Sequence, residues 1–128
     1  MEREWTMSGC FRAFFGLLLF GVISNLHAET AKTDALREKA AAGDAESAFY
    51  LGNEYFYGEN RMSNYTLAAY WYKKAAEQGD ADAQNSLGAC YLLGLGVPKN
   101  EKEAANLFRK AADQGEENAK KYLEAMKK

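Results

Sequence analysis

The chain repeats itself at a period of 36 residues. Residues 45–80 align with residues 81–116 without a gap, and 13 of the 36 aligned positions are identical. A fixed period of this size is typical of a stacked repeat array, in which each unit buries its apolar face only against its neighbours. Arrays of this kind usually present binding surfaces, so the period favours a binding protein over an enzyme with a deep pocket.

Each repeat predicts two helices separated by turn residues. In the second repeat the apolar positions follow helical spacing from residue 81, and Gly94 and Pro98 end the first helix. Asn100 and Glu103 have the spacing of a capping box, which predicts the start of the next helix, and Gly115 predicts its end. The first repeat has the same plan, with Asp44 and Asn64 as N-caps and Gly58 as a helix end, and Asn60 is expected to adopt a positive φ in its turn.

Two glycines lie inside predicted helices, where glycine costs about 1 kcal/mol relative to alanine. Gly52 and Gly88 occupy the same position of the two repeats. We expect them to allow a close approach between helices, with aromatic side chains filling the remaining space between units. The aromatic residues concerned are Trp71, Tyr72 and Phe108.

Half-units flank the two repeats. The sequence predicts an N-terminal capping half-repeat at 29–44, repeats at 45–80 and 81–116, and a C-terminal capping helix at 117–128. The last segment is rich in lysine, and a polar outer face on a terminal helix keeps a short array soluble. We expect its lysines, Lys120, Lys121, Lys127 and Lys128, to face solvent.

The first 28 residues have the order of a secretory signal peptide. Arg12 precedes an unbroken apolar run at 13–23, and Ala28 follows as a small residue at the expected cut. The run is shorter than the roughly 20 apolar residues of a spanning helix. We therefore expect translation from Met1 or Met7, cleavage after Ala28, and a periplasmic or secreted protein; the alternative is an uncleaved segment that anchors the chain in the inner membrane.

Charge, histidine and cysteine content limit the chemistry. The net charge is −2 with no concentrated basic run, which argues against a nucleic-acid partner. The single histidine, His27, lies in the predicted signal, so the exported chain has no histidine for a catalytic triad or a zinc site. Cys10 would leave with the signal, and Cys90 is then expected to pack on a helix as a small apolar side chain. We predict no catalytic residue, no metal and no cofactor.

Three segments resemble the Sel1-like repeat family, a branch of the tetratricopeptide-like helical repeats. They are WYKKAAEQGD at 71–80, ADAQNSLGACY at 81–91 and GLGVPKN at 94–100. The resemblance covers about residues 35–128. It implies an all-α fold, a short right-handed α-solenoid of antiparallel helix pairs whose first helices line a concave, partner-binding face. A cysteine-rich branch of the family is described as binding or hydrolysing β-lactams, but it has a cysteine pair in each repeat, and this chain has only Cys90 there.

The first helix of each repeat supplies the candidate partner-binding residues. If Leu51, Gly52 and Tyr55 and their counterparts face the core, the other side of the first helices forms the concave face. Aromatic side chains are common interface anchors, and the first repeat offers several on this side; the alternative is that Phe49 and Tyr50 pack on the N-terminal half-unit. The predicted partner-binding residues are Phe49, Tyr50, Asn53, Glu54, Tyr57, Asn85, Ser86 and Ala89, with Cys90 and Leu93 on the same side.

These features predict an exported protein, expected to be a monomer, that binds another protein through its concave helical face. A narrower version is an immunity protein that inhibits a toxic periplasmic effector enzyme. The alternatives are an adaptor in the assembly of envelope complexes and a weak hydrolase of the β-lactam type. The sequence does not select one partner among these.

Overall fold

The structure, a computed structural model, describes residues 31–58 and 63–128. The signal peptide expected at 1–28 and the turn expected at Asn60 lie outside the described residues. The chain divides into two units, 1–35 and 36–128. Residues 31–35, the described part of the first unit, are helical, and the second unit holds both repeats.

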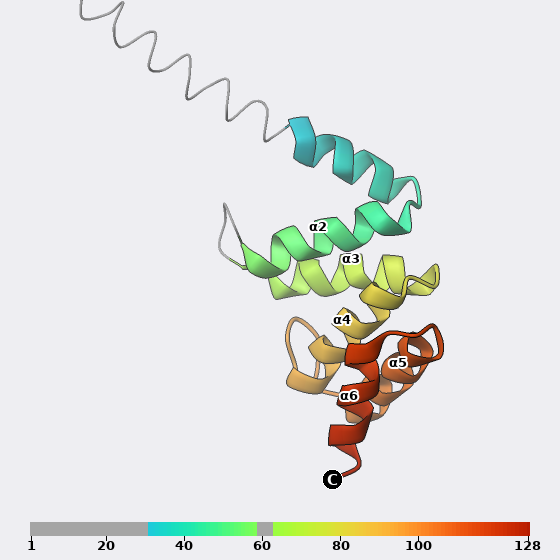
Figure 1. Ribbon diagram of the computed structural model, residues 1–128. Helices are drawn as coiled ribbons and strands as arrows, with labels where there is room; N and C mark the ends of the chain where they lie inside the picture. The colour runs from blue at the N-terminus through green and yellow to red at the C-terminus, as the bar shows by residue number, and fades with distance from the viewer. Residues whose placement is uncertain (1–30, 59–62) are drawn as a thin grey trace, which may run out of the picture. The chain divides into compact units, whose positions relative to one another are not determined.

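All regular structure in the described residues is helical. After a helical segment that ends at Ala41, the second unit contains α2 (Ala45–Tyr57), α3 (Tyr65–Glu77), α4 (Ala81–Leu93), α5 (Glu101–Asp113) and α6 (Glu117–Met126). Each helix packs on the next, most extensively within the pairs α2–α3 and α4–α5 (Figure 1). The predicted all-α fold of consecutive helix pairs is confirmed.

Side-chain caps begin the four central helices. Asn64 Oδ1 accepts the Leu67 amide at 3.0 Å, and Asp80 Oδ1 accepts the Ala83 amide at 2.8 Å. Each cap satisfies an amide that has no partner inside the helix. Asp44 caps α2 in the same way through Ser47, whose hydroxyl also donates to it, and these hydrogen bonds lower the pKa of the Asp44 carboxyl.

The expected capping box at α5 is only half formed. Asn100 Oδ1 accepts the Glu103 amide at 3.1 Å, but the Asn100 amide donates to the Tyr91 carbonyl at 2.9 Å. The matching amide of Asn64 donates to the Tyr55 carbonyl at 2.8 Å in the first repeat. The backbone of the first helix thus takes the place expected for the Glu103 side chain, and this bond ties the two helices of each pair together.

The helix ends follow the predicted glycines. Gly58 and Gly94 are the C-caps of α2 and α4, with φ of 62° and 69°. This left-handed conformation is strained for residues with a Cβ atom, and it lets each cap amide bond back to a carbonyl of the last turn.

The two helical glycines lie directly under aromatic rings. A Cβ atom on Gly52 would lie 2.6 Å from the ring carbons Cδ1 and Cε1 of Tyr72, and one on Gly88 would lie 2.8 Å from Cε1 of Phe108. Tyr72 and Phe108 occupy equivalent positions of α3 and α5, so both repeats use the same contact. The expected close approach at these glycines is confirmed.

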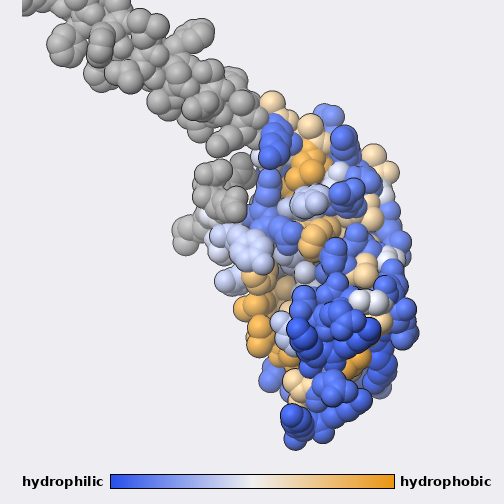
Figure 2. Space-filling model, viewed as in Figure 1, coloured by the Kyte–Doolittle hydropathy of each residue, from blue (hydrophilic) through white to orange (hydrophobic). Residues whose placement is uncertain are grey.

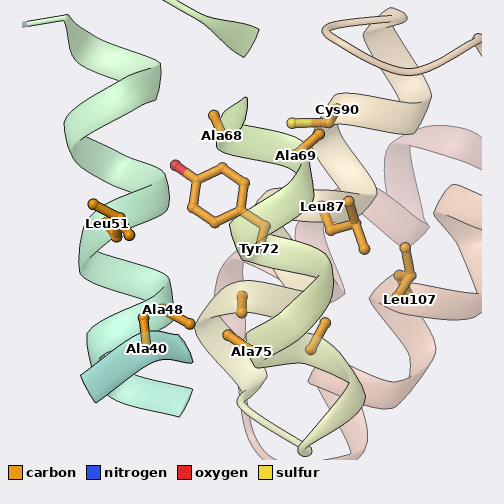
Figure 3. Packing of buried hydrophobic residues seen from close by; sticks show 12 residues of the cluster. Ala40, Ala48, Leu51, Ala68, Ala69, Tyr72, Ala75, Leu87, Cys90 and Leu107 are labelled. Carbon is orange, nitrogen blue, oxygen red and sulfur yellow. The ribbon is translucent and has the colours of Figure 1, made fainter. Parts of the chain in front are cut away.

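Small side chains fill most of the core. One buried cluster spans both repeats and combines alanines with Leu51, Tyr72, Leu87 and Leu107 (Figure 3). A second cluster lies between α5 and α6 and contains Ala104, Phe108, Ala111 and Ala119. Because alanine lets backbones approach closely, the few large side chains in the core carry much of its volume.

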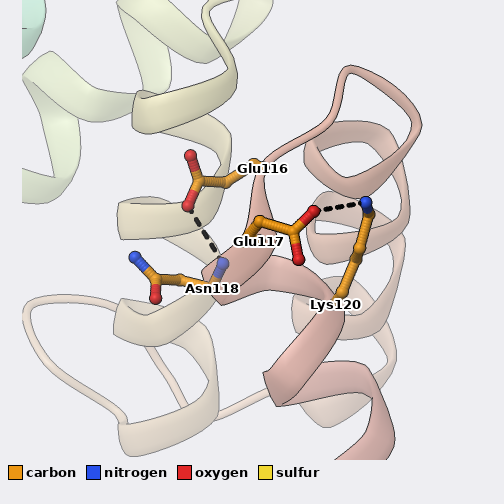
Figure 4. Close-up of polar contacts among 4 residues, drawn as sticks. All are labelled: Glu116, Glu117, Asn118 and Lys120. Carbon is orange, nitrogen blue, oxygen red and sulfur yellow. Dashed lines mark hydrogen bonds and ion pairs between the residues drawn. The ribbon is translucent and has the colours of Figure 1, made fainter.

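The last helix closes the described unit. Leu123 and Met126 of α6 pack against the second cluster, while Lys120, Lys121, Lys127 and Lys128 are exposed, as predicted. Figure 4 shows Glu116 accepting the Asn118 amide at the helix start and the Glu117–Lys120 ion pair, which measure 3.1 Å and 2.6 Å.

We predict that Gly88→Ala destabilises the protein by about 1–3 kcal/mol, because the new methyl group meets a fully buried ring. Chemical denaturation measures the change. Phe108→Leu on the Gly88→Ala background should cost less than the sum of the two single changes, since the smaller side chain makes room. A Gly88→Ala variant as stable as the parent would show that this contact is not tight.

Candidate functional site

One side of α2 forms an exposed stripe. Glu46, Tyr50, Glu54 and Tyr57 follow helical spacing and are all exposed, with Tyr50 and Tyr57 leaving 52% and 68% of their surface in solvent. The opposite side of the helix is buried through Ser47, Ala48, Leu51 and Gly52. We call Glu46, Tyr50, Glu54 and Tyr57 the α2 stripe.

A layer of aromatic rings supports the two tyrosines of the α2 stripe. The Phe49 ring lies 5.8 Å from that of Tyr50 and 5.9 Å from that of Tyr72, measured between centroids. The Phe56 ring lies 5.2 Å from that of Tyr57 and 5.1 Å from that of Tyr65 at the start of α3. Aromatic contacts at such distances are attractive, so these rings restrain the orientation of the exposed tyrosines.

Phe49 and Asn53 therefore have structural contacts as well as partial exposure. Phe49 packs against the main core cluster, which also contains Ala40 of the N-terminal half-unit. Asn53 Oδ1 accepts a hydrogen bond from the Tyr72 hydroxyl at 2.7 Å. Burial raises the pKa of Tyr72 well above its usual range, which keeps that hydroxyl protonated as a donor.

The same side of α4 is smaller and more buried. Asn85, Ser86 and Ala89 are half-buried, and Ala89 packs against the second core cluster. Asn85 Oδ1 is buried without a hydrogen-bond partner among the described residues. Leu93 is the prominent exposed residue here, with 65% of its surface in solvent. Of the predicted partner-binding residues, only Tyr50, Glu54 and Tyr57 of α2 are thus exposed, whereas Phe49 and Asn53 of α2 and the three residues of α4 are half-buried.

Cys90 does not belong to the exposed side of α4. It is fully buried and contacts the main core cluster, where Figure 3 shows it near Ala69 of α3. Burial raises the pKa of its thiol to about 11. Its expected role as a small packed side chain is confirmed, and its placement beside Ala89 and Leu93 on an outer side was wrong, because α3 of the preceding repeat covers that position.

A buried glutamine links three helices and was not predicted. Gln84 Nε2 donates to the Ala76 carbonyl at the end of α3 at 3.3 Å, and Gln84 Oε1 accepts from Gln114 Nε2 at 2.9 Å. Gln84 stands where the first repeat has Ala48. A polar residue at a position that is apolar in the other repeat could have indicated a buried hydrogen bond. The sequence could not identify the acceptor, because the Ala76 carbonyl belongs to another helix.

Apolar surface gathers near the end of α4. Figure 2 shows orange side chains beside the C-terminal end of α4 and the loop that follows it, whereas the surface over α6 is largely blue. Leu93 is exposed there, and Leu95 and Val97 of the loop are partly buried against the core. In the same region Gly96 would place a Cβ atom 2.1 Å from the Tyr65 carbonyl oxygen, so the loop lies directly on the start of α3.

Residues 31–58 and 63–128 were searched for a metal site and for a membrane-spanning helix. Within these ranges no group of three or more histidine, cysteine or acidic side chains is arranged to hold a metal ion. None of the helices described is both long enough and apolar enough to cross a membrane.

We predict that Cys90 reacts very slowly with Ellman's reagent in the native protein at pH 8, because its thiol is buried and stays protonated. The reaction should become fast in denaturant. A Cys10→Ser background removes the other cysteine as a source of signal. Rapid labelling of the folded protein at Cys90 would contradict this packing.

Several solved structures share this architecture. A Sel1 repeat protein from Oxalobacter formigenes is 35% identical with a TM-score of 0.69, over 71% of this chain and 26% of that one. A protective antigen of uropathogenic Escherichia coli is 31% identical with a TM-score of 0.68, over 71% of this chain and 20% of that one. Helicobacter pylori cysteine rich protein B is 30% identical with a TM-score of 0.70, over 74% of this chain and 71% of that one.

This chain spans only about a quarter of the length of the Oxalobacter protein and about a fifth of the length of the Escherichia coli antigen. No curated protein matches the sequence. The sequence model of the Sel1 repeat family matches residues 45–80 and 81–116, which are more than half of the chain. This match shows that the chain belongs to the Sel1 repeat family.

Proposed function

We propose that this Sel1 repeat protein binds another protein through the exposed side of its first helices, with the α2 stripe as the main contact. Sel1 repeats are typical protein-binding scaffolds. The observation that carries the proposal is the difference between the two repeats. Both make the same helix pair, yet only the first has aromatic residues at the exposed positions of its first helix.

The fold itself does not require those aromatic residues. Where the first repeat has Phe49, Tyr50, Phe56 and Tyr57, the second has Asn85, Ser86, Leu92 and Leu93. The second repeat forms its helix pair with the same caps and the same glycine contact. The repeat therefore folds without tyrosines at these exposed positions. Their presence on α2 favours a role in binding.

Exposed tyrosines on a supported surface are well suited to this role. A tyrosine loses few rotamers on binding and offers a large apolar area with one polar group. Residues of this type often dominate the energy of an interface, and losing one such anchor commonly costs 2 kcal/mol or more, about 30-fold in affinity. Standard interfaces bury about 800 Å² per partner, so the partner would also cover part of α4.

The proposed site of action is the periplasm or the cell exterior. The support is the sequence of residues 1–28, with its apolar run before Ala28. In that compartment the partner is a toxic effector enzyme that the protein inhibits, in the manner of an immunity protein, or a component of an envelope complex that it helps to assemble. An effector enzyme as the captured protein would identify the first role, and an envelope protein the second.

We predict that the double change Tyr50→Ala and Tyr57→Ala abolishes capture of the partner from the native extract, with the fold unchanged by circular dichroism. Phe49 is left in place because it packs in the core. Tyr70→Ala is the matched control, since Tyr70 is 50% exposed on α3 of the same repeat. Capture that survives the double change but not the control would contradict the assigned surface.

We also predict that the protein expressed from Met1 in a bacterial host is recovered from the periplasm with Glu29 as its first residue. Intact mass and N-terminal sequencing check this. Recovery in the membrane fraction with residues 1–28 attached would support the anchored alternative.

A further inference from the structure

The basic residues within the helices of the two repeats are confined to the second helix of each pair. The first helices, α2 and α4, contain Glu46, Glu54 and Asp82 but no lysine or arginine. The second helices, α3 and α5, contain all the basic residues of the helical parts of the repeats: Lys73, Lys74, Lys102, Arg109 and Lys110. The second helices also contain the acidic residues Glu77, Glu101, Glu103 and Asp113. The first helices differ from them because their acidic residues are not accompanied by any basic residue on the same helix, so the helix that bears the exposed tyrosines is acidic.

Two of these carboxylates flank a tyrosine of the α2 stripe. Glu46 and Glu54 lie four residues before and after Tyr50, so each is about one helical turn, or roughly 6 Å along the axis, from it. Both glutamates are exposed, and neither forms a salt bridge among the described residues. The stripe thus presents an aromatic ring between two negative charges that have no cation of their own.

A second concentration of negative charge lies on α4. Asp82 occupies the position in α4 that Glu46 has in α2. Partial burial, a hydrogen bond with Glu116 and the negative charge of Glu116 raise the pKa of Asp82. A cation that approached these two carboxylates would relieve their repulsion.

A guanidinium group fits a ring that lies between carboxylates. Arginine stacks on aromatic faces and donates hydrogen bonds to carboxylates at the same time, and a cation over an exposed ring contributes about 0.5–1 kcal/mol. The chain already contains the simpler form of this contact on α3, where Lys74 Nζ lies 5.6 Å from the centroid of the Tyr70 ring.

We propose that the partner of the α2 stripe is a protein segment that carries arginine next to apolar residues. The arginine stacks on Tyr50 between Glu46 and Glu54, and the apolar neighbours contact Tyr57 and Leu93. This inference rests on the proposed function and names the chemical class of its partner. The charge of the face disfavours nucleic acid, and a neutral glycan would use the tyrosines without needing the carboxylates.

The test measures binding of short labelled peptides to the full chain by fluorescence anisotropy. The probes are a peptide of arginine, leucine and serine and a matched peptide in which glutamate replaces arginine. We expect the arginine peptide to bind and the glutamate peptide not to bind. The affinity should fall about tenfold or more in the Glu46→Gln/Glu54→Gln variant and should decrease with rising salt.

The matched control is Glu77→Gln/Asp113→Asn, which removes two exposed carboxylates from equivalent positions at the ends of α3 and α5. This variant should bind within about twofold of the parent, since the carboxylates that it removes do not belong to the α2 stripe. Equal binding of both peptides, no binding of the arginine peptide, or an equal loss in both double variants would overturn the inference.

Capture of the native partner distinguishes a failure of the proposed function from a failure of the arginine-bearing partner alone. If capture of that partner is lost on changing Tyr50 and Tyr57 but is unaffected by Glu46→Gln/Glu54→Gln and by salt, the proposed function stands and the arginine-bearing partner is wrong. Salt-insensitive binding of soluble peptidoglycan fragments, or self-association of the chain through this face, would also overturn it. If capture survives the tyrosine changes, the proposed function itself fails.

Discussion

The glycine–aromatic contact is the interaction on which the rest of this structure depends. Tyr72 and Phe108 lie so close to Gly52 and Gly88 that a single Cβ atom would meet the rings at 2.6 Å and 2.8 Å. This contact sets the spacing within each helix pair, and the alanine-rich core is filled at that spacing. The cost of a glycine in a helix, about 1 kcal/mol, is offset by the burial of a large ring.

A second constraint holds neighbouring units together. Within each pair the amide of the second N-cap donates to the carbonyl of Tyr55 or Tyr91, and in the second pair the Gln114 side chain also donates to Gln84. Between the pairs, Gln84 donates to the Ala76 carbonyl at the end of α3. A buried amide that keeps its partners specifies one register, since a shift would leave it unsatisfied. With the framework held in this way, the exposed positions of α2 and α4 are free to differ, and the proposed binding surface lies where they do.

Much of the architecture was predictable because it depends on local patterns. The period predicted the repeats, Asp80 and Asn64 predicted helix starts, and Gly58 and Gly94 predicted helix ends, since caps act within a few residues of the chain. The errors involved contacts between elements. Glu103 was expected to close a capping box, but a carbonyl from the preceding helix takes that amide, and Cys90 was placed on an outer side that α3 covers.

The sequence by itself determined the helical repeat, the helix boundaries and the lack of basic residues on the first helices, because periodicity, caps and composition are properties of the chain. Only the tertiary structure decided which residues of the predicted binding face are exposed. Tyr50 and Tyr57 remain in solvent, whereas Phe49 and Asn53 also contact Tyr72 of α3 and the half-buried Ala89 packs against the second core cluster. The physical reason is that exposure at a helix position depends on which neighbouring helix packs against it, and the same position has different neighbours in the first and second repeats.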